Sequence, residues 1–357
     1  MSVYPSIYLS KFTIMKQLLN TLYIQTQGAY LRLDHETLKV EIEKEVKKQI
    51  PLHHLGSIVT FGNVLMSPYL IHRCGEDGRS LVWLSEFGRF KGRLAGSTTG
   101  NVLLRHAQHE VVRDAAATLA IARYMVAGKL QNTRTVVMRA AREANSEADR
   151  TQLTETAKRH AESIQKAELA PDLDTLRGIE GYAAKTYFGS FTCMIRTNRE
   201  TFALLDRNKR PPRDPINALL SFVYTLLKND CVSACEGVGL DPQMGFLHTL
   251  RPGRPALALD LMEEFRAPFA DRLVLSLINR KQIQPKDFVT RPGGAVHLVD
   301  DARRTLLEAY QNRKQEEVQH QIIDAKAPFG LIPHVQARLL ARHLRGDVPS
   351  YQPFIQK

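Results

Sequence analysis

The sequence predicts an α+β protein in which a small N-terminal β-sandwich-like domain is followed by a larger all-α-helical domain. Two observations lead to this prediction. In roughly the first ninety residues apolar and polar positions alternate, which is typical of strands with one buried face. From Asn101 onward the apolar positions recur at helical spacing instead. The pattern changes at Gly96–Gly100, a cluster of glycine, serine and threonine that is typical of a linker.

The β-rich domain is expected to span residues 15–95. Residues 1–14 precede the regular pattern and are expected to be a lead-in with an extended start, and residues 96–101 form the linker. His35 and Glu36 lie between two alternating runs, where a hairpin turn would lie. The expected strands are Thr21–Gln27, Tyr30–Leu33, Leu38–Ile42, Ser57–Phe61 and Ser80–Leu84.

Residues 102–357 are expected to form an α-helical catalytic domain. Its first helix is predicted over Val102–Ala127, where Gly128 would end it. Arg139–Glu168 is rich in Ala, Arg, Glu and Lys, which is typical of a solvated helix or helical pair. Further helices are predicted at Leu176–Phe191, Asn217–Cys235, Ala258–Ile278, Ala302–Gln321 and Val335–Leu344.

The composition excludes several classes of protein. With 357 residues, 43% hydrophobic and 24% charged, the chain can bury a full core, which excludes a largely disordered protein and a small disulfide-stabilised scaffold. The longest nearly apolar stretch, Leu219–Leu227, is far shorter than the ~18 residues of a membrane helix, so no membrane association is expected. The N-terminus lacks the features of a signal peptide, and a cytoplasmic protein is expected. Buried, reduced thiols are predicted for Cys74, Cys193, Cys231 and Cys235.

The charge balance and the absence of several motifs reduce the number of possible functions. The formal net charge is +12, and the basic excess is spread along the chain, which is consistent with a polyanionic partner or with simple solubility. The sequence contains no GxxxxGK[ST] phosphate loop, no GxSxG elbow and no HExxH pair. These absences argue against a nucleotide-driven motor, an α/β-hydrolase and a thermolysin-like protease.

A dispersed set of polar residues could carry chemistry. Glu180 lies between two glycines, and His248 follows an apolar helix and a turn that contains glycine. Asp260 and Glu263 are three residues apart and share a helix face, and Arg266 lies near that face. Carboxylates with one neutral imidazole suit Mn²⁺ or Mg²⁺ held together with substrate phosphates. Taken singly, these residues could equally be a surface carboxylate, a turn histidine and an intrahelical ladder of ion pairs.

A basic segment precedes the helix predicted at Asn217. Asp214 and Pro215 resemble an N-terminal cap followed by proline in the first turn. Basic side chains beside free helix N–H groups make a natural phosphate contact, although a solvated basic loop would have the same composition. The candidate DNA-binding residues are Arg207, Lys209, Arg210, Arg213 and Asn217, and a weaker basic group is Arg338, Arg342, His343 and Arg345.

These segments together resemble a known family, the CRISPR-associated integrase and endonuclease of spacer acquisition, usually called Cas-one. The resemblance runs from about Met15 to Phe354. Its most specific blocks are Arg210–Phe222, Gly245–His248 and Asp260–Arg266. It also includes Ile50-Pro-Leu, Val59-Thr-Phe-Gly62, Trp83-Leu84 with Gly88, and Lys129-Leu-Gln-Asn-Thr-Arg134. Among the branches of the family, the pattern is most similar to those of type I-C systems.

The resemblance implies a fold, a site and partners. Members have an N-terminal β-domain and a C-terminal helical domain, and their metal site of Glu, His and an acid falls on Glu180, His248 and Glu263. Asp260 is a further acid that could assist, and Arg266 matches a basic position near the reacting phosphate. Members often have proline where Glu264 stands here. The implied partners are double-stranded DNA (the prespacer and the CRISPR repeat), a second copy in a homodimer, a small ferredoxin-like subunit and an accessory nuclease that trims the prespacer.

The implied activity is strand transfer. A DNA 3′-OH attacks a phosphodiester at the edge of the repeat, and Mg²⁺ or Mn²⁺ would offset the charge that develops. The catalytic residues are then Glu180, His248, Glu263 and Arg266. Two alternatives remain: a metal-dependent nuclease that acts on branched DNA with water as the nucleophile, and a non-catalytic DNA-binding scaffold with the same fold.

Overall fold

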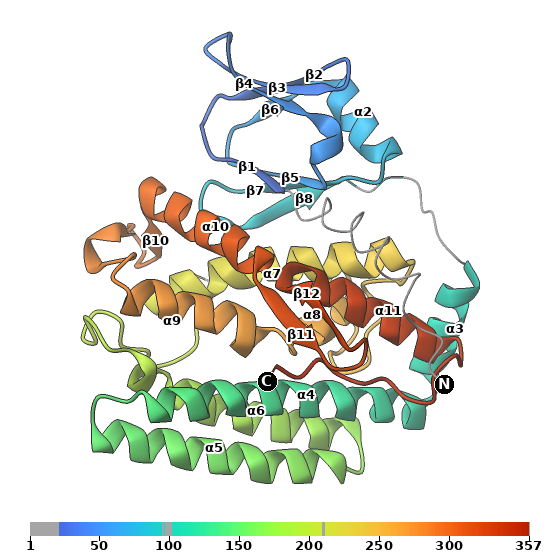
Figure 1. The fold of residues 1–357 in the computed structure, drawn as a ribbon, viewed down its shortest axis with the longest axis vertical. Coiled ribbons are helices and arrows are strands. Elements are labelled where there is room, and N and C mark those ends of the chain that lie inside the picture. Colours follow the sequence, from blue (N-terminus) through green and yellow to red (C-terminus); the bar gives the residue numbers. More distant parts are fainter. Residues whose placement is uncertain (1–20, 95, 97–101, 209–210, 357) are drawn as a thin grey trace. The chain divides into compact units, whose positions relative to one another are not determined.

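The structure is a computed structural model that describes residues 21–94, 96, 102–208 and 211–356 (Figure 1). The chain divides into two compact units: the first contains Met1–Thr99 and Lys314–Glu316, and the second contains Gly100–Arg313 and Glu317–Lys357. The first is built around β-sheets and the second is largely helical, so the predicted fold class is confirmed. The predicted lead-in over residues 1–14 and all of the predicted linker except Gly96 lie outside the described residues.

The first unit contains two four-stranded sheets and one helix. In one sheet the strand order is β1-β5-β7-β8, and all pairs are parallel except β7 with β8. The other sheet has the order β4-β3-β2-β6, and the turn between β2 and β3 places His35 at φ 53°. The strands are β1 (Thr21–Ile24), β2 (Tyr30–Asp34), β3 (Thr37–Ile42), β4 (Glu45–Pro51), β5 (Ser57–Phe61), β6 (Leu65–Met66), β7 (Ser80–Leu84) and β8 (Phe90–Arg93).

The hairpin predicted at His35 and Glu36 is therefore present. A helix that the sequence analysis did not anticipate, α2 (Pro68–Glu76), begins at Ser67, whose side chain accepts a hydrogen bond from the Leu70 backbone. Its Leu70 and Cys74 enter the core between the sheets, which is formed by alternate strand residues such as Leu31, Leu38, Ile58 and Leu81. This one-sided burial is what the alternating sequence predicts.

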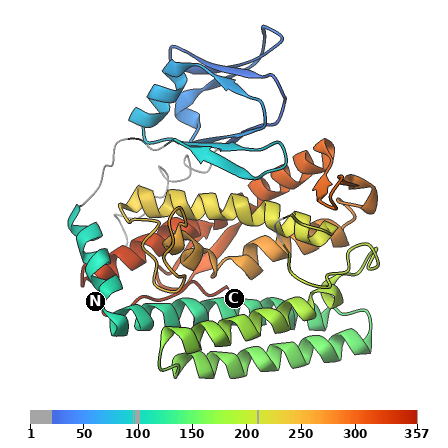
Figure 2. The ribbon, with the colours of Figure 1, turned by 180° about the vertical axis from the view of Figure 1, so that it is seen from behind.

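The second unit is a stack of helices (Figures 1 and 2). α4 packs along α5 and α6, and α7 packs against α8 and α11. The helices are α3 (Val102–Arg113), α4 (Ala115–Arg142), α5 (Glu147–Glu168), α6 (Leu173–Gly189), α7 (Pro215–Val238), α8 (Ala256–Met262), α9 (Arg272–Asn279), α10 (Asp300–Gln315) and α11 (Ile332–Leu344). Cys74, Cys231 and Cys235 are buried and reduced, as predicted, whereas Cys193 is only half-buried. No helix among the described residues is long and apolar enough to span a bilayer.

The helix predicted over Val102–Ala127 is instead two helices. Asp114 ends α3 and caps α4, because its carboxylate accepts hydrogen bonds from the Ala116 and Ala117 backbones. Gly128 does not stop α4, which continues to Arg142. A Cβ at Gly128 would lie 2.5 Å from Pro353, so the glycine permits close approach of the C-terminal segment and is not a helix terminator.

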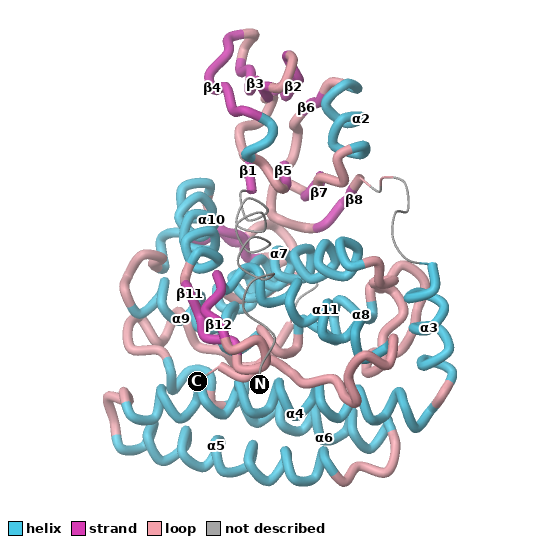
Figure 3. Tube along the Cα trace, turned by 45° about the vertical axis from the view of Figure 1, so that its right-hand side comes forward, coloured by secondary structure: helices cyan, strands magenta, loops and turns pink. Residues whose placement is uncertain are grey.

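The second unit is not entirely helical, which corrects the prediction for residues 102–357. Two short antiparallel hairpins interrupt it: β9 (Phe288–Thr290) pairs with β10 (Val296–Leu298), which Figure 1 labels, and β11 (Glu317–His320) pairs with β12 (Ala325–Pro328), as Figure 3 shows. The predicted helix Ala302–Gln321 consequently ends at Gln315. Ala258–Ile278 is likewise divided, since a π-helical turn over Arg266–Asp271 separates α8 from α9. Pro268, which has no N–H to donate, lies inside that turn.

Candidate active site

The folded second unit brings together the acidic and basic side chains that the sequence separates widely. Glu180 projects from α6, Lys129 from α4, and Glu263 from the end of α8. Lys129 Nζ lies 2.7 Å from Glu263 Oε2 and is also paired with Glu180 Oε1. Arg266 Nη2 lies 2.9 Å from Glu263 Oε1. The two carboxylates therefore share one ammonium group, and Glu263 also pairs with a guanidinium group.

Asp260 fixes the position of His248. The carboxylate of Asp260 is fully buried and accepts hydrogen bonds from the backbone N–H groups of Phe246 (2.6 Å), Leu247 (2.9 Å) and His248 (2.9 Å). It also bonds His248 Nδ1 at 2.6 Å. A Cβ at Gly245 would lie 2.6 Å from Asp260 Oδ2, so this position requires glycine. With both oxygens of Asp260 occupied in this way, the geometry favours a positioning role over the predicted role as a secondary ligand.

The other nitrogen of His248 faces the acidic pair. His248 Nε2 lies 3.8 Å from Glu263 Oε1, and the imidazole is about one-fifth exposed. A carboxylate on Nδ1 selects the tautomer in which that nitrogen carries the proton, which leaves the Nε2 lone pair available for a cation. Thus Glu180, His248 and Glu263 meet at one place, and Asp260 stands behind the histidine.

The surroundings keep Glu263 ionised although only 3% of its side chain is exposed. Burial alone would raise the pKa of this carboxyl, but the charges of Arg266 and Lys129 outweigh burial and hold it well below its ordinary value. Burial would lower the pKa of Lys129, and the two carboxylates raise it instead. Glu263 Oε2 makes no well-formed hydrogen bond despite being buried. A charged acceptor is therefore retained inside the protein by cations alone.

A second layer holds Arg266 in place. The Arg266 guanidinium lies 4.9 Å from the centre of the Tyr224 ring. Tyr224 and Tyr187 donate hydrogen bonds of 2.6 and 2.9 Å to the two oxygens of Asp271. Burial raises the pKa of Asp271 to about 6, although both tyrosines and nearby arginines oppose that rise. This layer connects α6, α7 and the π-helical turn beneath the site.

Glu264, the neighbour of Glu263, points into a different environment. Its fully buried carboxyl bonds the hydroxyl of Tyr351 (2.5 Å) and accepts from Gln336 Nε2 (2.9 Å) and the Phe354 backbone (2.8 Å). Burial raises the pKa of Glu264 to about 8, against these hydrogen bonds. Asn132 adds bonds to the backbone oxygens of Glu264 and Phe354. The C-terminal segment is thereby held against the end of α8.

The donor set fits a divalent metal ion, with Lys129 as the stand-in cation. Across the described part of the chain, no three His, Cys, Asp or Glu side chains are placed as a ready metal cluster. At this site the reason is visible, because an ammonium group lies between Glu180 and Glu263. Two carboxylates and an oriented imidazole are suitable ligands for Mg²⁺ or Mn²⁺, and the buried oxygen Oε2 of Glu263 has the Lys129 ammonium group as its partner.

Comparison with known proteins identifies the family. Residues 22–312 match the family model described as CRISPR associated protein Cas1. The chain belongs to the Cas1 family. It is 59% identical to CRISPR-associated endonuclease Cas1 1 of Moorella thermoacetica, over 96% of this chain and 100% of that protein. It is 48% identical to CRISPR-associated endonuclease Cas1 2 of Rhodospirillum rubrum, also over 96% of this chain and 100% of that protein.

Solved structures of the Cas1 fold agree with this assignment. A CAS1 protein from Thermotoga maritima superposes with a TM-score of 0.78 at 25% identity, over 92% of this chain and 97% of that one. A chain of a Cas6-RT-Cas1–Cas2 complex has a TM-score of 0.79 at 24% identity, covering 94% of this chain and 36% of that one, and shows the fold alone.

A further relative by sequence is a fusion protein. The CRISPR-associated exonuclease Cas4/endonuclease Cas1 fusion of Geobacter sulfurreducens is 37% identical over 94% of this chain and 60% of that protein.

Part of the predicted DNA-binding segment is placed differently from the prediction. Asn217 is fully buried and bonds Asp206 and Asp214, so the prediction that its side chain contacts DNA is wrong. Arg207 turns inward, bonds Asn217 and lies 5.4 Å from the Tyr224 ring centre. Arg213 is exposed, as a DNA contact requires, whereas Lys209 and Arg210 lie outside the described residues.

Sequence reasoning assigned no role to several residues of the Cas1 site. Lys129 was noted only within a matching block, because a lone lysine on a long helix carries no spacing signal. No sequence pattern links Tyr224 with Asp271 either, since the two residues are 47 positions apart in the chain. Glu264 stood out only as a departure from the proline common in the family. The replacement of that proline by glutamate is the useful signal, because a buried acid in an apolar segment needs hydrogen-bonding partners.

Proposed function

We propose that this chain is a metal-dependent DNA integrase and endonuclease of CRISPR adaptation. The observation that carries the proposal is the convergence of Glu180, His248 and Glu263 around one buried cation position. The Cas1 family membership and the relatives named endonucleases support it. The proposed substrates are a prespacer duplex and the CRISPR repeat.

The reaction that fits the site is transesterification. A DNA 3′-OH attacks the phosphorus of a target phosphodiester, a new P–O bond forms, and the target's own 3′-oxygen leaves with the proton given up by the attacking hydroxyl. One phosphodiester replaces another, so no nucleotide energy is required. A divalent ion held by Glu180, His248 and Glu263 would polarise the phosphoryl oxygen and stabilise the leaving oxygen. With water as the nucleophile the same arrangement would cleave DNA.

The chain's own residues prepare this site. Asp260 orients the imidazole of His248 through Nδ1, so that Nε2 faces Glu263. Arg266 keeps a positive charge beside Glu263, where it can offset charge on a phosphate. Lys129 neutralises the two carboxylates and competes with a metal ion for the same oxygens. We infer that Lys129 prevents repulsion in the metal-free protein and leaves those oxygens when the ion binds.

The proposed partners follow from the relatives. We propose a homodimer that works with a small Cas2-like subunit. The complex named Cas6-RT-Cas1–Cas2, one chain of which shares the fold, supports the Cas2-like subunit. An accessory prespacer-trimming nuclease is supported by the Cas4/Cas1 fusion. Arg213, with Lys209 and Arg210, is proposed to contact the DNA backbone, and a cytoplasmic location is proposed because the substrates are there.

A strand-transfer assay tests the proposal. The full chain, with and without the small partner, is mixed with a duplex bearing 3′-OH ends, a supercoiled plasmid carrying a CRISPR repeat, and Mn²⁺ or Mg²⁺. We expect covalent joining that is lost on chelation and in Glu180→Ala and His248→Ala, with Thr186→Ala, a half-buried position on α6, as a control. Cleavage of branched DNA without joining would favour the nuclease alternative, and DNA binding without any metal-dependent chemistry would favour the scaffold.

A further inference from the structure

Residues 351–356 lie beyond α11 and form neither helix nor strand. We call these six residues the C-terminal strap. Two of their side chains, Tyr351 and Phe354, are nevertheless among the largest fully buried side chains of the described residues. In Figures 1 and 2 the strap runs beside α4. A segment without regular structure can be buried only where other groups satisfy its backbone, so the partners of the strap indicate its role.

Asn132 on α4 joins the strap to the residue that follows Glu263. The buried side chain of Asn132 donates hydrogen bonds of 2.9 Å to the Glu264 carbonyl oxygen and 2.8 Å to the Phe354 carbonyl oxygen. Its own oxygen accepts a bond of 2.8 Å from the Gln356 backbone N–H. One amide thus uses both donors and its acceptor for three backbone groups that lie 132, 222 and 224 positions away in the sequence.

The strap also holds the side chain of Glu264. The Tyr351 hydroxyl bonds one oxygen of its carboxyl at 2.5 Å, and the Phe354 backbone N–H donates to the other at 2.8 Å. Gln336 on α11 donates to that second oxygen as well, at 2.9 Å. The backbone and the side chain of Glu264 are therefore both fixed, and Glu263 is the residue immediately before it.

A third contact lies on α4, one residue before Lys129. A Cβ at Gly128 would lie 2.5 Å from Pro353 Cβ and 3.0 Å from Pro353 Cγ. Alanine favours a helix interior more than glycine does, yet it would collide with the strap at this position. Gly128 therefore serves the packing of the strap and not the stability of α4.

These contacts surround one ion pair of the candidate active site. Lys129 Nζ and Glu263 Oε2 lie 2.7 Å apart. The two α4 residues that meet the strap flank the lysine, and Glu264 follows the glutamate directly. Displacing the strap would therefore change the separation of the two backbones that carry this pair. Glu180 shares the same ammonium group, so the spacing of the two carboxylates would change as well.

We propose that the C-terminal strap positions Glu263 relative to α4, and that Asn132 is the positioning residue through which the strap acts. The effect passes through the backbone, because Glu263 is held when the residue after it is held. Groups that orient metal ligands typically change metal affinity or activity ~10–100-fold when they are replaced. This inference rests on the proposed function, since it takes Glu263 as a ligand of the metal ion.

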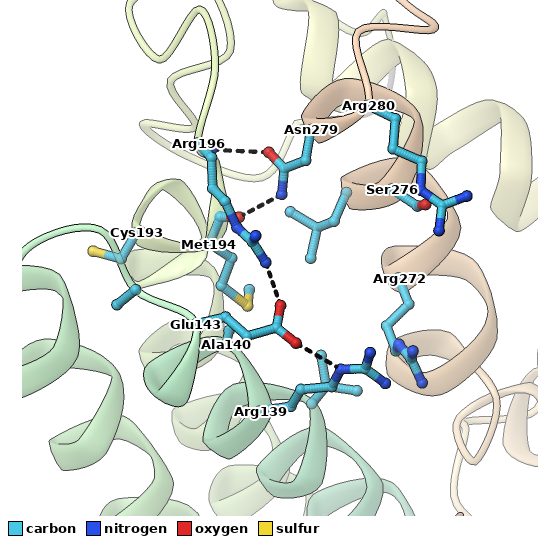
Figure 4. Close-up of a pocket in the computed structure, with 13 residues that line it drawn as sticks. Arg139, Ala140, Glu143, Cys193, Met194, Arg196, Arg272, Ser276, Asn279 and Arg280 are labelled. Atoms are coloured by element: carbon cyan, nitrogen blue, oxygen red, sulfur yellow. Dashed lines mark hydrogen bonds and ion pairs between the residues drawn. The ribbon is translucent and has the colours of Figure 1, made fainter.

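The far end of α4 is attached independently of the strap (Figure 4). Glu143 pairs with Arg139 on the same helix and with Arg196 after α6, and Asn279 accepts a bond of 2.8 Å from the Arg196 backbone. At 1.5 Å per residue, Glu143 is about 21 Å along the helix from Lys129. Glu143→Ala therefore loosens the attachment of α4 without touching the strap, and it serves as the control variant.

The test measures Mn²⁺ binding to the full chain without DNA, by electron paramagnetic resonance. Gly128→Ala should weaken Mn²⁺ binding about tenfold, because the added methyl group displaces the strap. Pro353→Gly removes both colliding atoms, so adding Gly128→Ala to that variant should change the affinity less than ~2-fold. Asn132→Leu loses all three hydrogen bonds and should weaken Mn²⁺ binding at least tenfold, whereas Glu143→Ala should bind as the wild type does.

The outcomes separate positioning from stability. A merely structural strap would lower resistance to urea in Asn132→Leu and leave the Mn²⁺ dissociation constant of every folded variant unchanged, which would overturn the proposal. A tenfold loss in Gly128→Ala that persists beside Pro353→Gly would overturn it too, and this comparison does not need Asn132→Leu to fold. If the variants behave as expected but the wild type never joins or cleaves DNA, the proposed function alone fails. A wild type that binds no Mn²⁺ would contradict both.

Discussion

Glu263 and Glu264 are consecutive, both buried, and opposite in electrostatic character. Glu263 faces Lys129 and Arg266, which hold its pKa well below the ordinary value. Glu264 faces neutral hydrogen-bond donors on Gln336, Tyr351 and the Phe354 backbone, and burial raises its pKa to about 8. The difference shows that burial does not decide the charge of a carboxyl by itself. The charges of the neighbouring groups decide whether a buried carboxyl is ionised, and adjacent residues in the chain can face different neighbours.

The two positions consequently have different roles. Glu263 is kept charged where a metal ion and a phosphate are proposed to bind. Glu264 is kept largely protonated at neutral pH and connects the end of α8 to the C-terminal segment. Four measurements test whether the two carboxyls differ in this way.

The largest expected effect is on catalysis. Glu263→Gln removes a charged ligand and should lower strand transfer or cleavage at least ~1,000-fold, since a metal ion supplies several kcal/mol of transition-state stabilisation. Glu264→Gln resembles the protonated side chain already present and should change the rate less than ~3-fold. Initial rates in Mn²⁺ compare the two variants, and an equal loss in both would abolish the proposed division of roles.

The next effect is on the metal-free fold. Lys129→Met leaves Glu180 and Glu263 facing each other without their shared cation, so unfolding in EDTA should require about 3 kcal/mol less free energy. Mn²⁺ should restore most of that loss, and the dissociation constant of Mn²⁺ should fall about tenfold. Urea unfolding and Mn²⁺ electron paramagnetic resonance measure these quantities. Lys129→Arg is the charge-preserving control, and unchanged metal affinity in Lys129→Met would contradict the competition between lysine and metal.

A smaller effect separates hydrogen bonding from charge at Glu264. Glu264→Ala leaves the Tyr351 hydroxyl and the Phe354 backbone N–H without their acceptor, whereas Gln336 keeps other acceptors, and the free energy of unfolding should fall by about 2 kcal/mol. Glu264→Gln retains an acceptor and should cost less than ~1 kcal/mol at pH 6.5. Chemical denaturation measures the free energy of unfolding of both variants. If Glu264→Gln were as unstable as Glu264→Ala, the charged form of Glu264 would be required.

The smallest effect is the pH dependence of stability. A carboxyl whose pKa is raised in the folded state binds its proton more tightly there than in the unfolded chain. The stability that Glu264 contributes is therefore present at low pH and declines as the pH rises through about 8. Melting temperatures between pH 6.5 and 8.5 should fall more steeply for the wild type than for Glu264→Gln. Parallel profiles would show that Glu264 is already ionised at pH 6.5.

Much of the fold follows from local patterns. The alternation in Tyr30–Leu33 and Leu38–Ile42 predicts two strands with one buried face, and they pair across the His35 turn. The apolar spacing of Asn217–Cys235 predicts most of α7. Errors occur where a local signal has a nonlocal cause, as at Gly128, where the neighbour that demands glycine is Pro353. A pattern of period two or 3.6 records burial but not the identity of the covering residues.

The fold class, the cap at Asp214 and the residue types that suit a divalent metal can be predicted from the sequence, because they depend on short spacings and side-chain chemistry. Packing of distant elements places Lys129 between Glu180 and Glu263, buries Asn217, and brings Glu264 into hydrogen-bond contact with the C-terminal segment. The contacts of Lys129 and Glu264 join residues 51 to 134 positions apart. Charge state depends on the distances that packing sets, and no spacing along a helix or strand encodes them.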